Sequence, residues 1–312
     1  MMTISLSRSL TAVAAASVLA TSAFAGGENW HNNYEESLAL AEENQQDVLL
    51  DFTGSDWCGW CIRLNEEVFS HDEFKTYAGE NFVLVELDYP ARKELPEDIV
   101  AQNEVLKEQF GIEGFPTIIL ADAQGRPYAQ TGYQQGGPEA YVAHLEELKQ
   151  KRVQRDEYLA AAEEAEGIER AQRLHDAMQV LGDDMAVKHY ASVVDEIMTI
   201  DADNEAGLKG HYEAIALAEE QRAGLNALMS GDVQGDPQGT IDGIDAFLED
   251  DALVPAIRQE ALAMKSQIMM FVLEDQAGAK VVLEQAIAVD PDSQMGQMLQ
   301  GALERFFGDD AE

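Results

Sequence analysis

Cysteine is nearly absent from this sequence of 312 residues. The chain contains only Cys58 and Cys61, within the segment Gly54 to Phe69, "GSDWCGWCIRLNEEVF". Thiol chemistry can therefore occur at one place only. The shortage also leaves no other thiol that could compete with this pair for disulfide exchange.

Basic residues are also scarce. Lysine and arginine total 20 against 59 aspartate and glutamate residues, so the formal net charge is −39 at pH 7. The acidity is spread along the chain, with −18 in residues 26–150 and −22 in residues 151–312. A uniformly acidic surface repels nucleic acids and anionic membranes and favours solubility. We therefore expect no nucleic acid partner.

No hydrophobic run is long enough to cross a bilayer. The longest candidate extends from Leu10 to Ala20, roughly 11 residues against the ~20 that a spanning helix needs. It follows Arg8 and precedes the small-residue ending Ala23-Phe24-Ala25, which is the pattern of a signal peptide over residues 1–25. We expect a periplasmic or secreted bacterial protein with no membrane insertion after signal cleavage.

Strand and helix patterns alternate through residues 26–150. We expect them in this order: helix 30–46 with Trp30 on its apolar stripe, strand 47–53, a helix after the cysteines, strand 81–89, helix 97–109, a hairpin of strands 116–122 and 127–133, and a helix from near Pro138. Alternation followed by a hairpin predicts an α/β domain with a mixed sheet that helices flank on both faces.

Residues 151–312 show a different pattern. Strand patterns disappear, and apolar residues recur at helical spacing between breaks that allow seven or eight helices. The segment 193–207, "VVDEIMTIDADNEAG", matches 281–296, "VVLEQAIAVDPDSQMG", in its apolar frame, its turn and its final glycine. This recurrence predicts an all-α domain of helical hairpins and resembles the tetratricopeptide family, although the period is not clean.

The cysteine pair allows three interpretations. A structural zinc site needs further ligands, and no histidine stands at a recognisable spacing to supply them. A structural disulfide would close a loop too short to restrict the unfolded chain much. Redox exchange needs only these two residues: Cys58 at a helix N-terminus, where the thiolate is stabilised, and Cys61 one turn later on the same face. Redox exchange is the preferred interpretation.

A resemblance to a known family also supports redox exchange at the cysteine pair. The segments "DFTGSDWCGWC", "FVLVELDYP" and "GIEGFPTIILADAQGRPYAQTGY" resemble a bacterial thioredoxin-family domain over about residues 30–150. The similarity extends to secreted proteins with a Trp-Cys-x-Trp-Cys motif and to the periplasmic reductase domain of the membrane electron-transfer protein DsbD. We expect three parts: signal peptide 1–25, thioredoxin-like domain 26–150 and tetratricopeptide-like helical domain 151–312.

The resemblance implies roles for individual residues. Cys58 matches the nucleophile, Cys61 the resolving cysteine of a redox-active disulfide, and Pro116 the cis-proline beside it. Asp51 matches a buried proton acceptor, but one extra residue separates it from the first cysteine. The remaining substrate-binding candidates are Trp57, Gly59, Trp60, Phe115 and Thr117.

Trp60 replaces a proline that is common in reducing thioredoxins, so the redox direction stays open on this point. Asp56, Glu66 and Glu67 flank the pair and are opposed only by Arg63. Acidic neighbours disfavour a thiolate and make a disulfide less oxidising. The charges therefore favour a reductase-like or isomerase-like protein over a strong oxidase.

We expect a thiol-disulfide oxidoreductase that uses no metal or other cofactor. Its partners would be disulfide-containing client proteins and an upstream thiol electron donor such as a membrane reductase, and the helical domain would serve client binding or homodimer formation. The alternative is an adaptor or chaperone-like protein in which the helices bind a partner and the thioredoxin-like domain is a scaffold.

Overall fold

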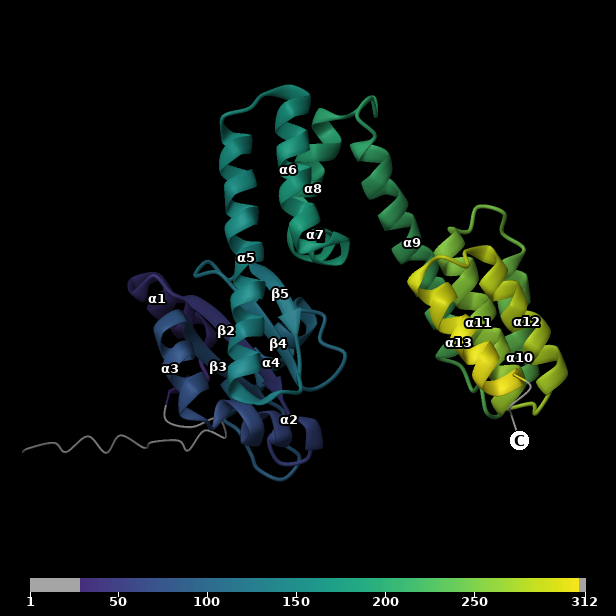
Figure 1. Cartoon of the computed structure of the whole chain (residues 1–312), viewed down its shortest axis with the longest axis horizontal. Helices are drawn as coiled ribbons and strands as arrows, with labels where there is room; N and C mark the ends of the chain where they lie inside the picture. Colours follow the sequence, from purple (N-terminus) through teal and green to yellow (C-terminus); the bar gives the residue numbers. More distant parts are fainter. Residues whose placement is uncertain (1–28, 309–312) are drawn as a thin grey trace, which may run out of the picture. The chain divides into compact units, whose positions relative to one another are not determined.

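The computed structural model describes residues 29–308 and divides them into two compact units, with the division after Arg152 (Figure 1). The predicted signal peptide, residues 1–25, lies outside the described residues. The expected domain boundary at residue 150 falls inside the helix α5 (Gly137–Glu163). The two units are thus joined by a continuous helix.

The first unit contains a five-stranded sheet and its covering helices. Its elements are β1 (Trp30–His31), α1 (Tyr34–Asn44), β2 (Asp47–Thr53), α2 (Gly59–Leu64), the π-helix η1 (Asn65–Phe69), α3 (Asp72–Asn81), β3 (Phe82–Asp88), α4 (Glu97–Gln109), β4 (Thr117–Ala121), β5 (Pro127–Thr131) and the start of α5.

The sheet has the strand order β1-β3-β2-β4-β5. β1, β3 and β2 run parallel, whereas β4 is antiparallel to β2 and β5 to β4. The predicted mixed sheet is thereby confirmed. β2 lies at the centre, and every one of its residues is buried. Its register places Asp51 opposite Glu86 of β3 on one side and Ile118 of β4 on the other.

The two faces of the sheet have different cores. On one face, α1 and α4 cover alternate apolar residues of β2 and β3, namely Val48, Leu50, Phe52, Val83, Val85 and Leu87. On the other face, Tyr141 of α5 lies with its ring centroid 5.9 Å from that of Phe69 in η1 and 6.3 Å from that of Phe74 in α3. Residues alternate across a strand, so Asp51 and Glu86 belong to this second face.

Two expectations for this unit were incomplete. Trp30 belongs to β1 and not to the first helix; it is buried, with its ring 5.2 Å from that of Phe69. The spacing of Trp30 from the apolar residues that follow it fits a helical stripe, and spacing alone does not distinguish a short strand from the first turn of a helix. The segment after the cysteines is α2, η1 and α3 in succession.

The second unit is helical, as expected. After α5 come α6 (Gly167–Leu181), α7 (Asp183–His189), α8 (Ala191–Ile200), α9 (Leu208–Met229), α10 (Pro237–Leu248), α11 (Pro255–Phe271), α12 (Gln276–Val289) and α13 (Gln294–Phe307). Neighbouring helices pack together, α6 on α8 and α12 on both α11 and α13.

Each of the two similar segments of this unit contains the end of a helix and the turn that follows it, and 281–296 also includes the start of α13. Asp201 closes the first turn by accepting hydrogen bonds from the backbone of Ala206 and Leu208 at 3.0 and 2.8 Å. Asp290 accepts one from the backbone of Ser293 at 3.1 Å in the second turn. The final glycines differ, because Gly207 is left-handed before α9 whereas Gly296 lies inside α13.

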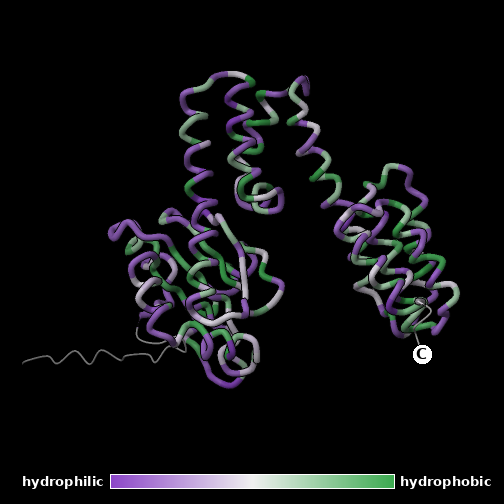
Figure 2. The backbone as a smooth tube through the Cα atoms, viewed as in Figure 1, coloured by the Kyte–Doolittle hydropathy of each residue, from purple (hydrophilic) through white to green (hydrophobic). Residues whose placement is uncertain are grey.

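Hydrophobic and hydrophilic residues alternate along the helices of the second unit (Figure 2). Small apolar clusters fill the space between them, including Leu225, Ile244 and Ala261 of α9, α10 and α11. Within residues 29–308, no helix combines the length and the apolar character that crossing a membrane requires.

Candidate functional site

Cys58 and Cys61 form a disulfide at the start of α2. β2 ends at Thr53, and the Cys58 backbone amide donates to the carbonyl of Gly54 at 2.9 Å, which turns the chain into the helix. Cys58 is the N-cap of α2, and its sulfur accepts a hydrogen bond from the Cys61 amide at 3.2 Å. Both cysteines are buried. Free amides at this helix end stabilise negative charge on the Cys58 sulfur when the disulfide opens.

The loop before the cysteines is held by side chains. Ser55 donates to Asp88 through its backbone amide at 2.9 Å and its hydroxyl at 2.7 Å. The indole nitrogen of Trp57 donates to the carbonyl of Tyr89 at 2.7 Å. Gly54 lies directly against the Trp57 ring, where a Cβ atom would come 2.6 Å from Cε2. A glycine is needed here because of this close approach.

A first aromatic wall, next to the disulfide, consists of the rings of Trp57, Tyr89 and Phe115. The Phe115 ring lies 5.9 Å from Trp57 and 5.0 Å from Tyr89, and the Lys107 ammonium lies over the Tyr89 ring. The Phe115–Pro116 bond is cis. The next residue, Thr117, is buried, and its hydroxyl donates to the Gly114 carbonyl at 2.8 Å.

A second aromatic wall contains Trp60, which is 53 % exposed. Its ring lies 5.2 Å from that of Tyr133 in the loop after β5, and the Arg63 guanidinium lies over both rings. Glu67 joins the two by accepting from Arg63 at 2.7 Å and from the Tyr133 hydroxyl at 2.5 Å. Gly59, between Cys58 and Trp60, has open space where a Cβ would be.

A cavity of about 240 Å³ connects Asp51 with the second cysteine. It is lined by Asp51, Thr53, Ser55, Cys61, Ile62, Asn65, Glu66, Phe69 and Glu86. Burial raises the pKa of the Asp51 carboxyl well above its usual range, and the nearby Glu86 and Asp88 raise it further. A carboxyl group with this shift holds a proton at pH values where exposed aspartates have lost theirs.

Sequence reasoning missed Glu86 and Asp88. Both are buried, at 6 % and 5 % exposure, and both act on Asp51. A signal existed: in "FVLVELDY" the two acids stand two positions apart in a strand of otherwise apolar residues, so they share one face. Which face they share depends on the sheet, and the sequence alone does not define it.

Two of the acidic residues that flank the cysteines in sequence, Asp56 and Glu67, have hydrogen-bond partners that stabilise their negative charge. Asp56 accepts from the backbone amides of Ala91 and Arg92 at 2.8 and 2.7 Å, and the Ala91 bond chiefly lowers its pKa. The pKa of Glu67 is lowered first by the Tyr133 hydrogen bond and then by Arg63. Asp56 and Glu67 thus have partners that stabilise their negative charge, whereas burial raises the pKa of Asp51.

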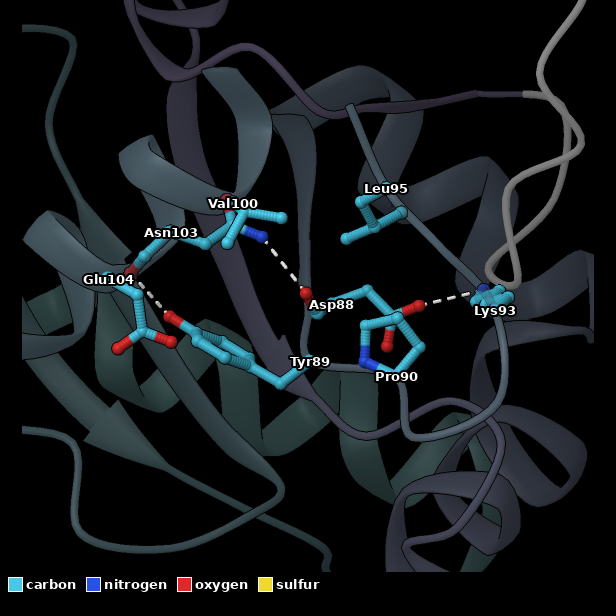
Figure 3. Close-up of a pocket in the computed structure, with 8 residues that line it drawn as sticks. All are labelled: Asp88, Tyr89, Pro90, Lys93, Leu95, Val100, Asn103 and Glu104. Carbon is cyan, nitrogen blue, oxygen red and sulfur yellow. Dashed lines mark hydrogen bonds and ion pairs between the residues drawn. The ribbon is translucent and has the colours of Figure 1, made fainter. Parts of the chain in front are cut away.

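A second cavity of about 210 Å³ lies at the end of β3 (Figure 3). One of the residues that line it, Tyr89, has the carbonyl that accepts from Trp57. Asp88 pairs with Lys93 at 2.7 Å at one end, and the Tyr89 hydroxyl donates to the Asn103 carbonyl at the other. The Asn103 side chain in turn donates to the Asp88 carbonyl at 3.0 Å. These contacts fix the end of β3 against α4. Within residues 29–308, no three His, Cys, Asp or Glu side chains are grouped to hold a metal ion.

The first unit is similar to known proteins. A family model described as a thioredoxin-like domain matches residues 34–149. The disulfide bond reductase DsbH of Chlamydia pneumoniae is 37 % identical over 113 residues, which are 36 % of this chain and 68 % of DsbH. The thioredoxin-related protein DsbJ of the same organism is 35 % identical, over 33 % of this chain and 30 % of DsbJ.

A thiol:disulfide interchange protein DsbD, from Pseudoalteromonas atlantica, is 29 % identical over 120 residues. The match covers 38 % of this chain but only 18 % of DsbD. The chain thus spans two thirds of DsbH and much smaller parts of DsbJ and DsbD.

Replacing Gly54 by alanine tests how Trp57 is held. The new methyl group would displace the indole and weaken its bond to the Tyr89 carbonyl, so we expect a loss of about 1–3 kcal/mol in unfolding free energy. Urea unfolding followed by tryptophan fluorescence measures this, because all three tryptophans, residues 30, 57 and 60, lie in the first unit. Gly79→Ala, where a Cβ meets nothing within 4 Å, should cause no loss. Equal stability of Gly54→Ala and the wild type would contradict the packing described.

Replacing Asp51 by asparagine tests its burial. Because the folded protein raises the pKa of Asp51, the wild type loses stability as the pH rises from the ordinary aspartate pKa toward the folded one. Asp51→Asn should therefore unfold with about 1 kcal/mol or more of additional free energy at pH 7.5, and the gain should vanish below about pH 4. Urea titrations of the oxidised proteins at both pH values measure it. The same gain at both pH values, or no gain for Asp51→Asn relative to the exposed Glu43→Gln, would reject this account.

Proposed function

The chain belongs to the thioredoxin-like family of thiol-disulfide oxidoreductases, and on this premise we propose that it reduces or isomerises disulfides in client proteins. One observation carries the proposal: a disulfide whose first cysteine caps a helix and whose second cysteine shares a cavity with a buried carboxyl. The helix end favours attack by one sulfur, and the cavity supplies an acceptor for the proton of the other.

In the reductive direction, the Cys58 thiolate attacks one sulfur of the client disulfide. A Cys58–client bond forms, the client disulfide breaks, and the departing client sulfur takes a proton from solvent. Cys61 then passes its proton to Asp51 and attacks the Cys58 sulfur. The Cys58–Cys61 bond forms, and the second client sulfur leaves and is protonated. Two electrons have passed from the dithiol to the client.

The client would lie across the two aromatic walls. Trp57 and Trp60 are 49 % and 53 % exposed and flank the buried sulfurs. The Phe115 backbone before Pro116 would pair with an extended client segment, because main-chain bonds bind clients without regard to their side chains. Gly59 leaves room above the helix start, and Thr117 anchors the strand that follows Pro116.

We propose that the protein works in the bacterial periplasm or after secretion. The signal-peptide pattern of residues 1–25 supports this, as does the relation to Dsb proteins. An upstream thiol donor, such as a membrane reductase, would return the Cys58–Cys61 disulfide to the dithiol. No metal or other cofactor is needed for these steps.

The helical unit would bind clients or form a homodimer. Apolar side chains remain exposed on it, among them Phe271 at 64 % and Met298 at 63 %. The same observation supports the alternative of an adaptor whose thioredoxin-like unit is only a scaffold. A scaffold needs neither the cysteine pair nor the buried Asp51, so trapping experiments separate the two functions.

Variants of the two cysteines test the exchange reaction. In an insulin-reduction assay, Cys58→Ser should lower activity by more than about 100-fold, because the nucleophile is lost. Cys61→Ser should accumulate mixed disulfides with clients, because the resolving thiol is lost; non-reducing gels and mass spectrometry detect them. Wild-type protein without turnover and Cys61→Ser without trapped clients would favour the adaptor.

Equilibration with glutathione buffers tests the redox direction. Asp51, Glu86 and Asp88 disfavour thiolate near the disulfide, so we expect a reduction potential of about −180 to −270 mV, the range from disulfide isomerases to thioredoxin. The oxidised fraction can be read from alkylation at each buffer ratio. A potential near the value of about −120 mV of the oxidase DsbA would reject the reductive or isomerising direction.

A further inference from the structure

Glu86 lies beside Asp51 on the neighbouring strand. The parallel register pairs the two residues, so their side chains leave the sheet on the same face. Asp51 is 7 % exposed and Glu86 6 % exposed. Two carboxylates this close, shielded from water, repel each other strongly, so the pair resists losing both protons.

Both carboxyl groups line the cavity that Cys61 also lines. Asp51 Oδ1 and Asn65 Oδ1 are buried there, and neither accepts a hydrogen bond from the residues that the structure describes. A buried acceptor oxygen is costly unless a donor reaches it. A protonated Asp51 has a hydroxyl group that can donate a hydrogen bond. A cavity that contains two buried acceptor oxygens and lacks a donor for them among the described residues therefore favours the protonated form of Asp51.

Other titratable groups also surround the carboxyl pair. Asp88 of β3 raises the pKa of Asp51, and Glu66 of η1 lines the same cavity. From α5, Tyr141 is close enough that the charge of Asp51 contributes to raising its pKa. On β1, His31 pairs in register with Val85 and is exposed. Lys93 forms an ion pair with Asp88 at 2.7 Å.

We propose that Glu86 is a positioning residue for proton transfer at Cys61. It carries the negative charge of the carboxyl pair, so Asp51 keeps its proton to higher pH and gives it to Cys61 when the disulfide is opened. This inference rests on the proposed thiol-disulfide exchange and adds a second carboxyl to the proton acceptor proposed above.

The proton balance follows from the exchange cycle. When a donor thiolate attacks the Cys58 sulfur, a donor–Cys58 disulfide forms and the Cys58–Cys61 bond breaks. The Cys61 sulfur leaves as a thiolate and takes the Asp51 proton, which makes both carboxyls negative. A second donor thiol then releases Cys58 and completes the donor's own disulfide. When the dithiol reduces a client, Cys61 returns that proton to Asp51 as its sulfur attacks Cys58. Glu86 changes neither bonds nor electrons, but its charge makes Asp51 a stronger base, closer in pKa to the thiol it serves.

The test uses the full chain and 5,5′-dithiobis(2-nitrobenzoate), a small disulfide probe. The reduced protein releases one coloured thiolate when Cys58 attacks the probe and a second when Cys61 resolves the mixed disulfide. Stopped-flow measurement across pH gives the midpoint at which the second step switches on. Glu86→Gln should lower that midpoint by about one pH unit, because Asp51 then ionises more readily.

A double-mutant cycle separates a role through Asp51 from a direct one. In an Asp51→Asn background, Glu86→Gln should leave the pH profile of the second step unchanged. Glu86→Asp keeps the charge and should retain the wild-type midpoint. The exposed Glu43→Gln, the same chemical change on α1, should also leave it unchanged.

The proposal is overturned if Glu86→Gln keeps the wild-type midpoint, or if its full shift persists in the Asp51→Asn background. Should Glu86→Gln fail to fold, Glu86→Asp alone decides: a midpoint at the wild-type value supports the proposal, and a fall of a full unit contradicts it. The probe is not a protein, so failure to reduce insulin with the expected pH shift intact would reject the proposed function and leave this inference standing.

Discussion

The structure depends on the central position of β2. Because β2 pairs with β3 on one side and β4 on the other, it is buried along its whole length and has one fixed register. That register sets Asp51 beside Glu86, and the end of the strand at Thr53 sets where the chain turns into α2. The disulfide and the carboxyl group beneath it are therefore positioned by the same strand.

Opposing electrostatic effects meet at the cysteine pair. The N-terminus of α2 stabilises a thiolate on Cys58 by an amount typical of helix ends, about 0.3–1 kcal/mol at an exposed site and up to ~2 when partly buried. Buried carboxyls below Cys61 act in the other direction, and their effect is stronger per charge because water does not screen them. The two cysteines thus have different surroundings: Cys58 lies at the helix end, and Cys61 lines the cavity that contains the buried carboxyls. This difference is what the proposed function uses, with Cys58 as the attacking sulfur and Cys61 as the resolving thiol.

Local patterns predicted much of the fold and the site. The strand 47–53 and the helix 97–109 have the predicted bounds, because each has a clear apolar pattern and breaks at its ends. Trp30 was placed in the wrong element, since a two-residue strand is defined only by its pairing with β3. Tyr133 was not identified, because its contact with Trp60 joins segments more than 70 residues apart.

The sequence by itself determined the chemistry that is available: one cysteine pair at a helix start, an acidic chain, and an α/β unit followed by helices. These features are encoded in neighbouring residues, so they can be read without the fold. Only the tertiary structure decided which acids lie beside Asp51 in the cavity that Cys61 lines. Asp56 lies near in sequence but is held by the Ala91 and Arg92 amides, whereas Glu86 lies 25 residues beyond Cys61 and lines the same cavity. The electrostatic potential at a cysteine sulfur depends on how far away the charged groups are and how deeply they are buried, and strand register sets both.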